Sequence, residues 1–190
     1  MQPSIRLSRR AFLQASLAAA AAAGSGFACS RNHSPWRVLT VNEARALAGM
    51  VDQIIPPDQD QGAVWAGVVN YIDRQLNGPL ESFQDIYRRG LAGVDQSSQS
   101  RYGKLFADLE SAQQIDLLHL LEVNKAPGPG WKQGPSSEFF ATVVDHTMQG
   151  FYGDPRHGGN RDGVSWKMLQ LPYPPIRGRV RFDLPRARSG

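Results

Sequence analysis

Apolar residues recur every three or four positions along most of this chain, and no long segment alternates between apolar and polar residues. The clearest stretch lies between Thr40 and Pro56. Its apolar residues are Ala44, Leu47, Ala48, Val51, Ile54 and Ile55. This spacing places side chains on one face of a helix, whereas a half-buried strand needs a spacing of two. The pattern predicts an all-α fold.

Signals at the ends of this stretch support a helix. The Thr40 hydroxyl and the Glu43 carboxylate can each accept a backbone N–H in a capping box, and Pro56-Pro57 ends the helix. Four further segments have helical spacing: residues 63–76, 80–94, 111–121 and 138–151. The chain has 190 residues, 41% of them hydrophobic, which is enough for one core. We expect a single irregular helical bundle of about five helices.

The first 28 residues have the layout of a secretory signal. Arginines at positions 6, 9 and 10 precede an uncharged, alanine-rich run of 13 residues from Ala11 to Ala23, and the region has no acidic residue. Such a run is too short to span a membrane but fits the apolar part of a signal peptide. Because small residues also precede Cys29, we expect removal of residues 1–28 and a periplasmic mature protein.

Arg9 and Arg10, followed by Phe12 and Leu13, resemble a twin-arginine export signal. The alternative is an ordinary secretory signal with a chance arginine pair. The twin-arginine translocon carries proteins that are already folded, often with a bound partner. Because the sequence contains no cofactor motif of its own, a folded partner is the natural reason for this route.

Cys29 is the only cysteine in the sequence. A single cysteine excludes an internal disulfide, a thiol-ligated metal cluster and a CxxCH haem attachment. Two interpretations of Cys29 stay open. It is either the lipidated first residue of a lipoprotein associated with the inner membrane, or a free N-terminal thiol left by cleavage after Ala28.

Charge and motifs exclude several classes of function. The mature chain has 18 basic and 17 acidic residues, whereas a nucleic-acid-binding protein needs a dense basic face. Neither G-x-G-x-x-G nor G-x-x-x-x-G-K-[ST] occurs, so we predict no cofactor in this chain. His119 and Glu122 share a helix face, but no further ligand lies near them in the sequence, and there is no G-x-S-x-G elbow. We predict neither a metal site nor a catalytic residue.

The segment from Gly150 to Gly163 has five glycines in 14 residues. Glycines permit positive φ angles and close backbone approaches, so we expect a loop of defined shape. Side chains on or beside this loop are candidates for contacts with a partner: Tyr152, Arg156, His157, Asn160, Arg161 and Trp166. The segment is either a recognition loop or a rigid surface loop that caps the bundle.

Charge is uneven along the mature chain. Residues 29–155 have a net charge of −5, and residues 156–190 a net charge of +6. The basic tail either neutralises the helical body or lies along an acidic partner. We divide the chain into a signal peptide, a linker, a helical domain, and a glycine-rich loop with a basic C-terminal tail that packs on that domain, at residues 1–28, 29–39, 40–151 and 152–190.

Four blocks in this order resemble the gluconate 2-dehydrogenase subunit 3 family. They are the twin-arginine leader from Ser8 to Gln14, DQIIP at residues 52–56, GVVNYID at residues 67–73 and DPRHGGNRDGVSWK at residues 154–167. The glycine-rich block is the most specific of them. Their order and spacing cover almost the whole mature chain.

This resemblance implies the small subunit of a membrane-associated dehydrogenase that oxidises a sugar or a sugar acid. In such an enzyme a large flavoprotein of the glucose-methanol-choline (GMC) type carries FAD, and a multihaem c-type cytochrome passes electrons to the quinone pool. The small subunit carries the export signal, and the flavoprotein crosses with it. The resemblance therefore implies a non-catalytic subunit that escorts and stabilises a folded FAD-dependent dehydrogenase.

The residues alone leave two other functions open. One is an independent periplasmic enzyme or small-molecule-binding protein with its site at the glycine-rich loop. The other is a lipoprotein adaptor anchored at Cys29. A saturable ligand site on the isolated chain would favour the first, and the mass of the mature N-terminus would decide the second.

Overall fold

The structure, a computed structural model, describes residues 34–171, which form six α-helices and no strand. The helices are α2 (Val41–Ile54), α3 (Val68–Leu76), α4 (Gln84–Tyr102), α5 (Ser111–Glu122), α6 (Ser136–Tyr152) and α7 (Val164–Met168). Short 3₁₀ turns join them: η1 (Glu81–Phe83), η2 (Phe106–Asp108), η3 (Pro129–Gln133), η4 (Pro155–His157) and η5 (Arg161–Gly163). The all-α prediction is confirmed. The predictions for Arg9, Arg10, Phe12, Leu13, Cys29 and most of the basic tail lie outside the described residues.

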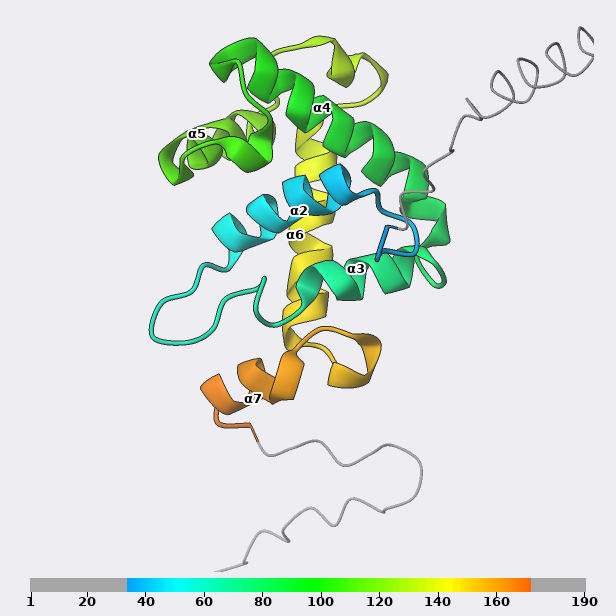
Figure 1. The fold of residues 1–190 in the computed structure, drawn as a ribbon, viewed down its shortest axis with the longest axis vertical. Coiled ribbons are helices and arrows are strands. Elements are labelled where there is room, and N and C mark those ends of the chain that lie inside the picture. The colour runs from blue at the N-terminus through cyan, green and yellow to red at the C-terminus, as the bar shows by residue number, and fades with distance from the viewer. Residues whose placement is uncertain (1–33, 172–190) are drawn as a thin grey trace, which may run out of the picture. The chain divides into compact units, whose positions relative to one another are not determined.

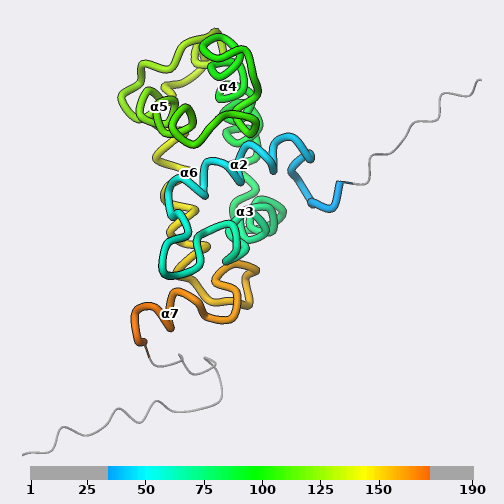
Figure 2. The backbone as a smooth tube through the Cα atoms, turned by 60° about the vertical axis from the view of Figure 1, so that its left-hand side comes forward, coloured from blue at the N-terminus to red at the C-terminus, as the bar shows by residue number. Residues whose placement is uncertain are grey.

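Two helices form the centre of the bundle. Helix α6 runs through the middle, and α2 crosses it (Figure 1). Each of these two helices contacts the other and also α3, α4 and α5. Both views place α5 and the C-terminal half of α4 toward one end of α6, and α7 toward the other end (Figure 2). The largest fully buried side chains come from five of the helices and η2: Leu47, Met50, Ile72, Leu76, Tyr87, Leu91, Phe106, Leu117, Leu121 and Phe151.

Helix α2 begins as its sequence predicts. The Glu43 N–H donates to Thr40 Oγ1 at 3.2 Å, and the Thr40 N–H donates to Glu43 Oε2 at 2.8 Å. This reciprocal pair satisfies two N–H groups that the first turn leaves without helical partners. The helix ends at Ile54, just before Pro56.

Helix α3 begins later than its sequence pattern predicts. The spacing favoured a helix from residue 63, but residues 63–67 form turns, and the helix starts at Val68. Gly67 explains the difference, because its φ of 81° lies in the left-handed region. Val64, which the helical pattern would bury, is 43% exposed in the turn.

Helix α4 is longer than predicted and continues to Tyr102. Its second half is rich in polar residues, so the apolar spacing that indicates a helix is missing there. Two of them are nevertheless fully buried. Ser97 Oγ donates to the Pro127 carbonyl at 2.5 Å, and Ser98 Oγ donates to the Lys104 carbonyl at 2.7 Å. These buried hydroxyls hold the two loops that follow α4 and α5 against the helix.

The segment before α2 packs on the domain from Ser34 onward. The fully buried Asp73 carboxylate, on α3, accepts the backbone N–H groups of residues 37, 38 and 39 at 2.8, 2.9 and 3.1 Å. Three such donors compensate the cost of burying a carboxylate. The folded body therefore includes residues that precede Thr40.

Candidate functional site: the glycine-rich loop

The glycine-rich loop joins α6 to α7. It contains η4 and η5, and both lie at the end of α6 that faces away from α5 (Figure 1). The loop packs against α3 and against the turn at residues 63–67. Three regions that are distant in the sequence therefore meet at this site.

The first turn of the loop is built around Asp154. Its Oδ1 accepts the Arg156 backbone N–H at 2.9 Å, and its Oδ2 accepts Arg156 Nη2 at 2.6 Å. These hydrogen bonds lower the pKa of Asp154 to about 2. The Arg156 side chain is thus held in one orientation while more than half of it stays exposed.

The middle of the loop lies directly on α6 and α3. At Gly159 a Cβ atom would collide with the carbonyl oxygen of Gly150, so only glycine permits this approach. Next to it, the Gly158 carbonyl accepts a hydrogen bond from Asn70 Nδ2 at 2.8 Å. Asn70 belongs to the GVVNYID block, so this block and the glycine-rich block are in direct contact in the fold.

Asn160 closes the loop from inside. Its Nδ2 donates to the Gly153 carbonyl at 2.8 Å, and its Oδ1 accepts the Ser165 N–H at 3.1 Å. The residue has a φ of 42°, a region that asparagine tolerates better than most residues. Asn160 was predicted as a contact residue, but its side chain is fully buried and holds the loop in shape.

Trp166, on α7, forms a hydrogen bond to the last residue of α6. Its Nε1 donates to the Tyr152 carbonyl at 3.0 Å, and the residue is only 9% exposed. Like Asn160, Trp166 acts within the chain. Tyr152 itself is 37% exposed and stands edge-on to the buried Phe151 ring.

Arg161 brings in an aromatic residue that sequence reasoning missed. Its backbone N–H donates to the Ala66 carbonyl at 3.0 Å, and its guanidinium lies 5.5 Å from the centroid of the Trp65 ring. A cation at this distance is attracted to the face of an indole. Nothing in the sequence links two residues so far apart. The only hint was an exposed tryptophan just before Gly67.

The structure thus separates the predicted contact residues into two groups. Asn160 and Trp166 are buried and shape the loop. The exposed group is Tyr152, Arg156, His157 and Arg161; together with Trp65, which was not predicted, we call it the loop rim. A rigid frame with exposed aromatic and cationic side chains can bind another surface with little loss of side-chain entropy.

The other histidines and carboxylates form no second candidate site among the described residues. Among residues 34–171 no three His, Cys, Asp or Glu side chains are placed to hold a metal ion. His119 and Glu122, 3.4 Å apart, form an exposed pair. His146 is buried, its Nδ1 lies 3.0 Å from the Tyr87 hydroxyl, and burial lowers its pKa. None of the helices in this part of the chain is both long enough and apolar enough to cross a bilayer.

Residues 34–171 thus form a small all-helical domain with one polar, glycine-rich loop of defined shape. The family model for gluconate 2-dehydrogenase subunit 3 matches residues 41–172, and the chain belongs to this family. The matched region contains three of the four sequence blocks described above, including the glycine-rich block. Searches among curated proteins and among solved structures give no match. Family membership makes this chain a subunit of a dehydrogenase complex.

Proposed function

We propose that this chain is the non-catalytic small subunit of an FAD-dependent, GMC-type dehydrogenase for a sugar or a sugar acid. It binds the folded flavoprotein, escorts it through the twin-arginine translocon into the periplasm, and then stabilises it. The observation that carries this proposal is the loop rim, held on a frame of buried hydrogen bonds within the region that matches the family.

The loop rim suits a protein partner better than a small ligand. Its side chains come from two segments of the chain and are spread over the last residue of α6, η4, η5 and the turn at residues 63–67. The Arg161 guanidinium lies over the Trp65 ring, and Arg156 is a second cation held in one orientation by Asp154. Arginine and tryptophan are residue types enriched in interface hot spots. The matching surface on the flavoprotein would be acidic with an apolar centre.

The redox groups belong to the partners in this proposal. FAD is held by the large subunit, and haem c by a multihaem cytochrome where the complex contains one. The small subunit supplies the export signal at Arg9 and Arg10 and, if Cys29 is lipidated, a membrane anchor.

Export of the flavoprotein tests the escort directly. The double change Arg9→Lys and Arg10→Lys, made in a strain that co-expresses the flavoprotein, should leave both proteins in the cytoplasm. Arg6→Lys, which alters a leader arginine outside the pair, is the matched control and should leave export intact. Normal periplasmic flavoprotein in the double variant would refute the escort.

The docking surface is tested separately from export. Arg161→Ala should weaken co-purification of the flavoprotein by about tenfold or more, as for a hot-spot residue. Arg88→Ala removes an exposed arginine of α4 that pairs with Asp85 and lies outside the loop rim, and it should leave co-purification unchanged. Equal loss in both variants, or in neither, would contradict docking through the loop rim.

A further inference from the structure

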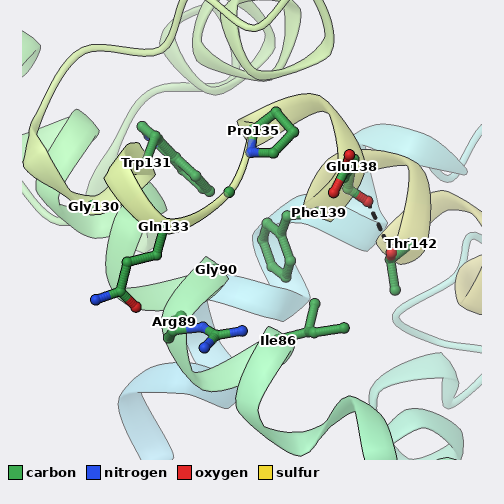
Figure 3. A pocket seen from close by; sticks show the side chains of 11 residues that line it. Ile86, Arg89, Gly90, Gly130, Trp131, Gln133, Pro135, Glu138, Phe139 and Thr142 are labelled. Atoms are coloured by element: carbon green, nitrogen blue, oxygen red, sulfur yellow. Dashed lines mark hydrogen bonds between the residues drawn. The ribbon is translucent and has the colours of Figure 1, made fainter.

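A second site lies between α4, η3 and α6. It is a pocket of about 230 Å³, and its lining comes from the first two turns of α4, from η3 and the residues just after it, and from the first two turns of α6 (Figure 3). The residues that the following argument uses are Ile86, Arg89, Trp131, Gln133, Pro135 and Phe139. The loop rim contributes none of the lining.

The pocket is formed before any ligand arrives. Trp131 Nε1 donates to Ser97 Oγ at 2.8 Å, and Ser97 Oγ in turn donates to the Pro127 carbonyl. The indole lies so close to Gly93 that a Cβ atom there would come within 2.9 Å of the ring. These contacts fix the orientation of the tryptophan.

One side of the pocket is apolar and aromatic. The Trp131 and Phe139 rings have centroids 6.2 Å apart and are inclined by 32°. Pro135 and Ile86 extend this wall on either side of Phe139 (Figure 3). Such a wall favours a flat ring over a flexible or hydroxylated chain.

The polar edge of the pocket consists of two donors. The guanidinium of Arg89 and the amide of Gln133 lie on the side away from Pro135 (Figure 3). Among the described residues neither has a hydrogen bond or an ion pair, whereas the neighbouring Arg88 pairs with Asp85 at 3.0 Å. Glu138, the acidic residue of the lining, makes no ion pair with Arg89 and lies across the pocket from it (Figure 3).

We propose that this pocket binds a small aromatic carboxylate. The ring lies against Trp131 and Phe139, and the carboxylate accepts hydrogen bonds from Arg89 and Gln133. Guanidinium–carboxylate pairs are among the strongest hydrogen-bonded contacts in proteins. A volume of about 230 Å³ is below the roughly 300–1,000 Å³ of pockets for drug-sized ligands, so a ligand with a single ring fits best.

The probe for this proposal is phenylacetate, titrated into the whole mature chain. The readout is the NMR signal of the Trp131 indole N–H, which reports on the pocket wall. Phenylacetamide has the same shape without the charge and should bind about tenfold more weakly. Gluconate carries a carboxylate but no ring, and should bind more weakly than phenylacetate.

Two neighbouring arginines provide the variants. Arg89→Gln should weaken phenylacetate binding by about tenfold and leave phenylacetamide binding unchanged. Arg88→Gln, one position along α4 and outside the lining, should change neither. Both side chains are exposed, so neither change should affect folding.

Four outcomes would overturn the proposal. They are a Trp131 signal that does not saturate at millimolar phenylacetate, equal affinities for phenylacetate and phenylacetamide, an unchanged affinity in Arg89→Gln, and tighter binding of gluconate than of phenylacetate. Saturable binding that depends on both the charge and Arg89 would establish the site, whatever the outcome of the export experiment.

Discussion

Asp73 Oδ1 lies 2.9 Å from the backbone nitrogen of Val38, a residue 35 positions earlier in the chain. Asp73 also accepts the N–H groups of residues 37 and 39, so Asp73→Asn would replace one of its two accepting oxygens with an N–H₂ group that faces at least one of these backbone donors. We expect a loss of about 2–3 kcal/mol in the free energy of unfolding, measured by urea denaturation. Asp85→Asn, at an exposed carboxylate, should cost less than about 0.5 kcal/mol. Equal losses of unfolding free energy in the two variants would show that the buried contacts of Asp73 stabilise the fold no more than an exposed carboxylate does.

The close approach of the loop to α6 predicts a contrast between two glycines. Gly159→Ala should displace the loop, because the new methyl group meets the Gly150 carbonyl. Gly134→Ala is the matched control, since nothing lies within 4 Å of a Cβ atom there. We expect faster amide hydrogen exchange at residues 153–165 in the first variant only. Unchanged exchange in Gly159→Ala would mean that the loop is not held by this contact.

The buried His146 predicts how stability depends on pH. Burial lowers the pKa of its imidazole, and the nearby Asp145 charge opposes this only in part. The unfolded chain therefore takes up this proton at a higher pH, near 6.5, than the folded chain. Between these two pKa values the unfolded state binds more protons, so the free energy of unfolding falls as the pH drops below about 6.5, by at most about 1.4 kcal/mol per pH unit.

Two histidine variants test this assignment by urea denaturation at a series of pH values. His146→Phe should remove this part of the pH dependence even if the variant is less stable overall. His119→Gln, at an exposed histidine on another helix, is the matched control. If the pH dependence of the unfolding free energy below about pH 6.5 is unchanged in His146→Phe, another group takes up the proton.

The buried hydroxyl of Thr147 leads us to expect that one substitution at this position stabilises the protein. Thr147 is fully buried, and its Oγ1 has no hydrogen-bond partner among the described residues. Thr147→Val replaces the hydroxyl with a methyl group of the same shape and should raise the free energy of unfolding by about 1 kcal/mol. Ser136→Ala should lower it by about 1 kcal/mol, because that hydroxyl donates to the Leu121 carbonyl at 3.0 Å. A loss of stability in Thr147→Val would reveal a partner for the hydroxyl.

Local patterns in the sequence were sufficient for much of the fold. The Thr40 capping box and the spacing after it predict α2 correctly, because both depend on contacts within a few residues. The start of α3 could not be predicted from its apolar spacing, which continues through Gly67 although the backbone does not. The second half of α4 was missed because Ser97 and Ser98 are buried through hydrogen bonds to the loops that follow α5 and α4, which apolar spacing does not reveal.

In the candidate site, too, the features set by local sequence could be predicted and those set by tertiary contacts could not. Glycine content predicts a loop of defined shape, and the polar residues within it are candidates for contacts with a partner. It does not show that Asn160 faces inward, because its partners are backbone groups whose positions depend on the loop itself. Trp65 joins the site only through tertiary packing.

Helix α6 begins at the aromatic pocket and ends at the loop rim. With 17 residues it is about 25 Å long, and it is braced by α2, α3, α4 and α5. A rod of this kind keeps its two ends at a constant separation. The pocket near Phe139 and the exposed ring of Tyr152 are therefore held about 20 Å apart, so the two ends of α6 offer two separate contact regions at a fixed spacing.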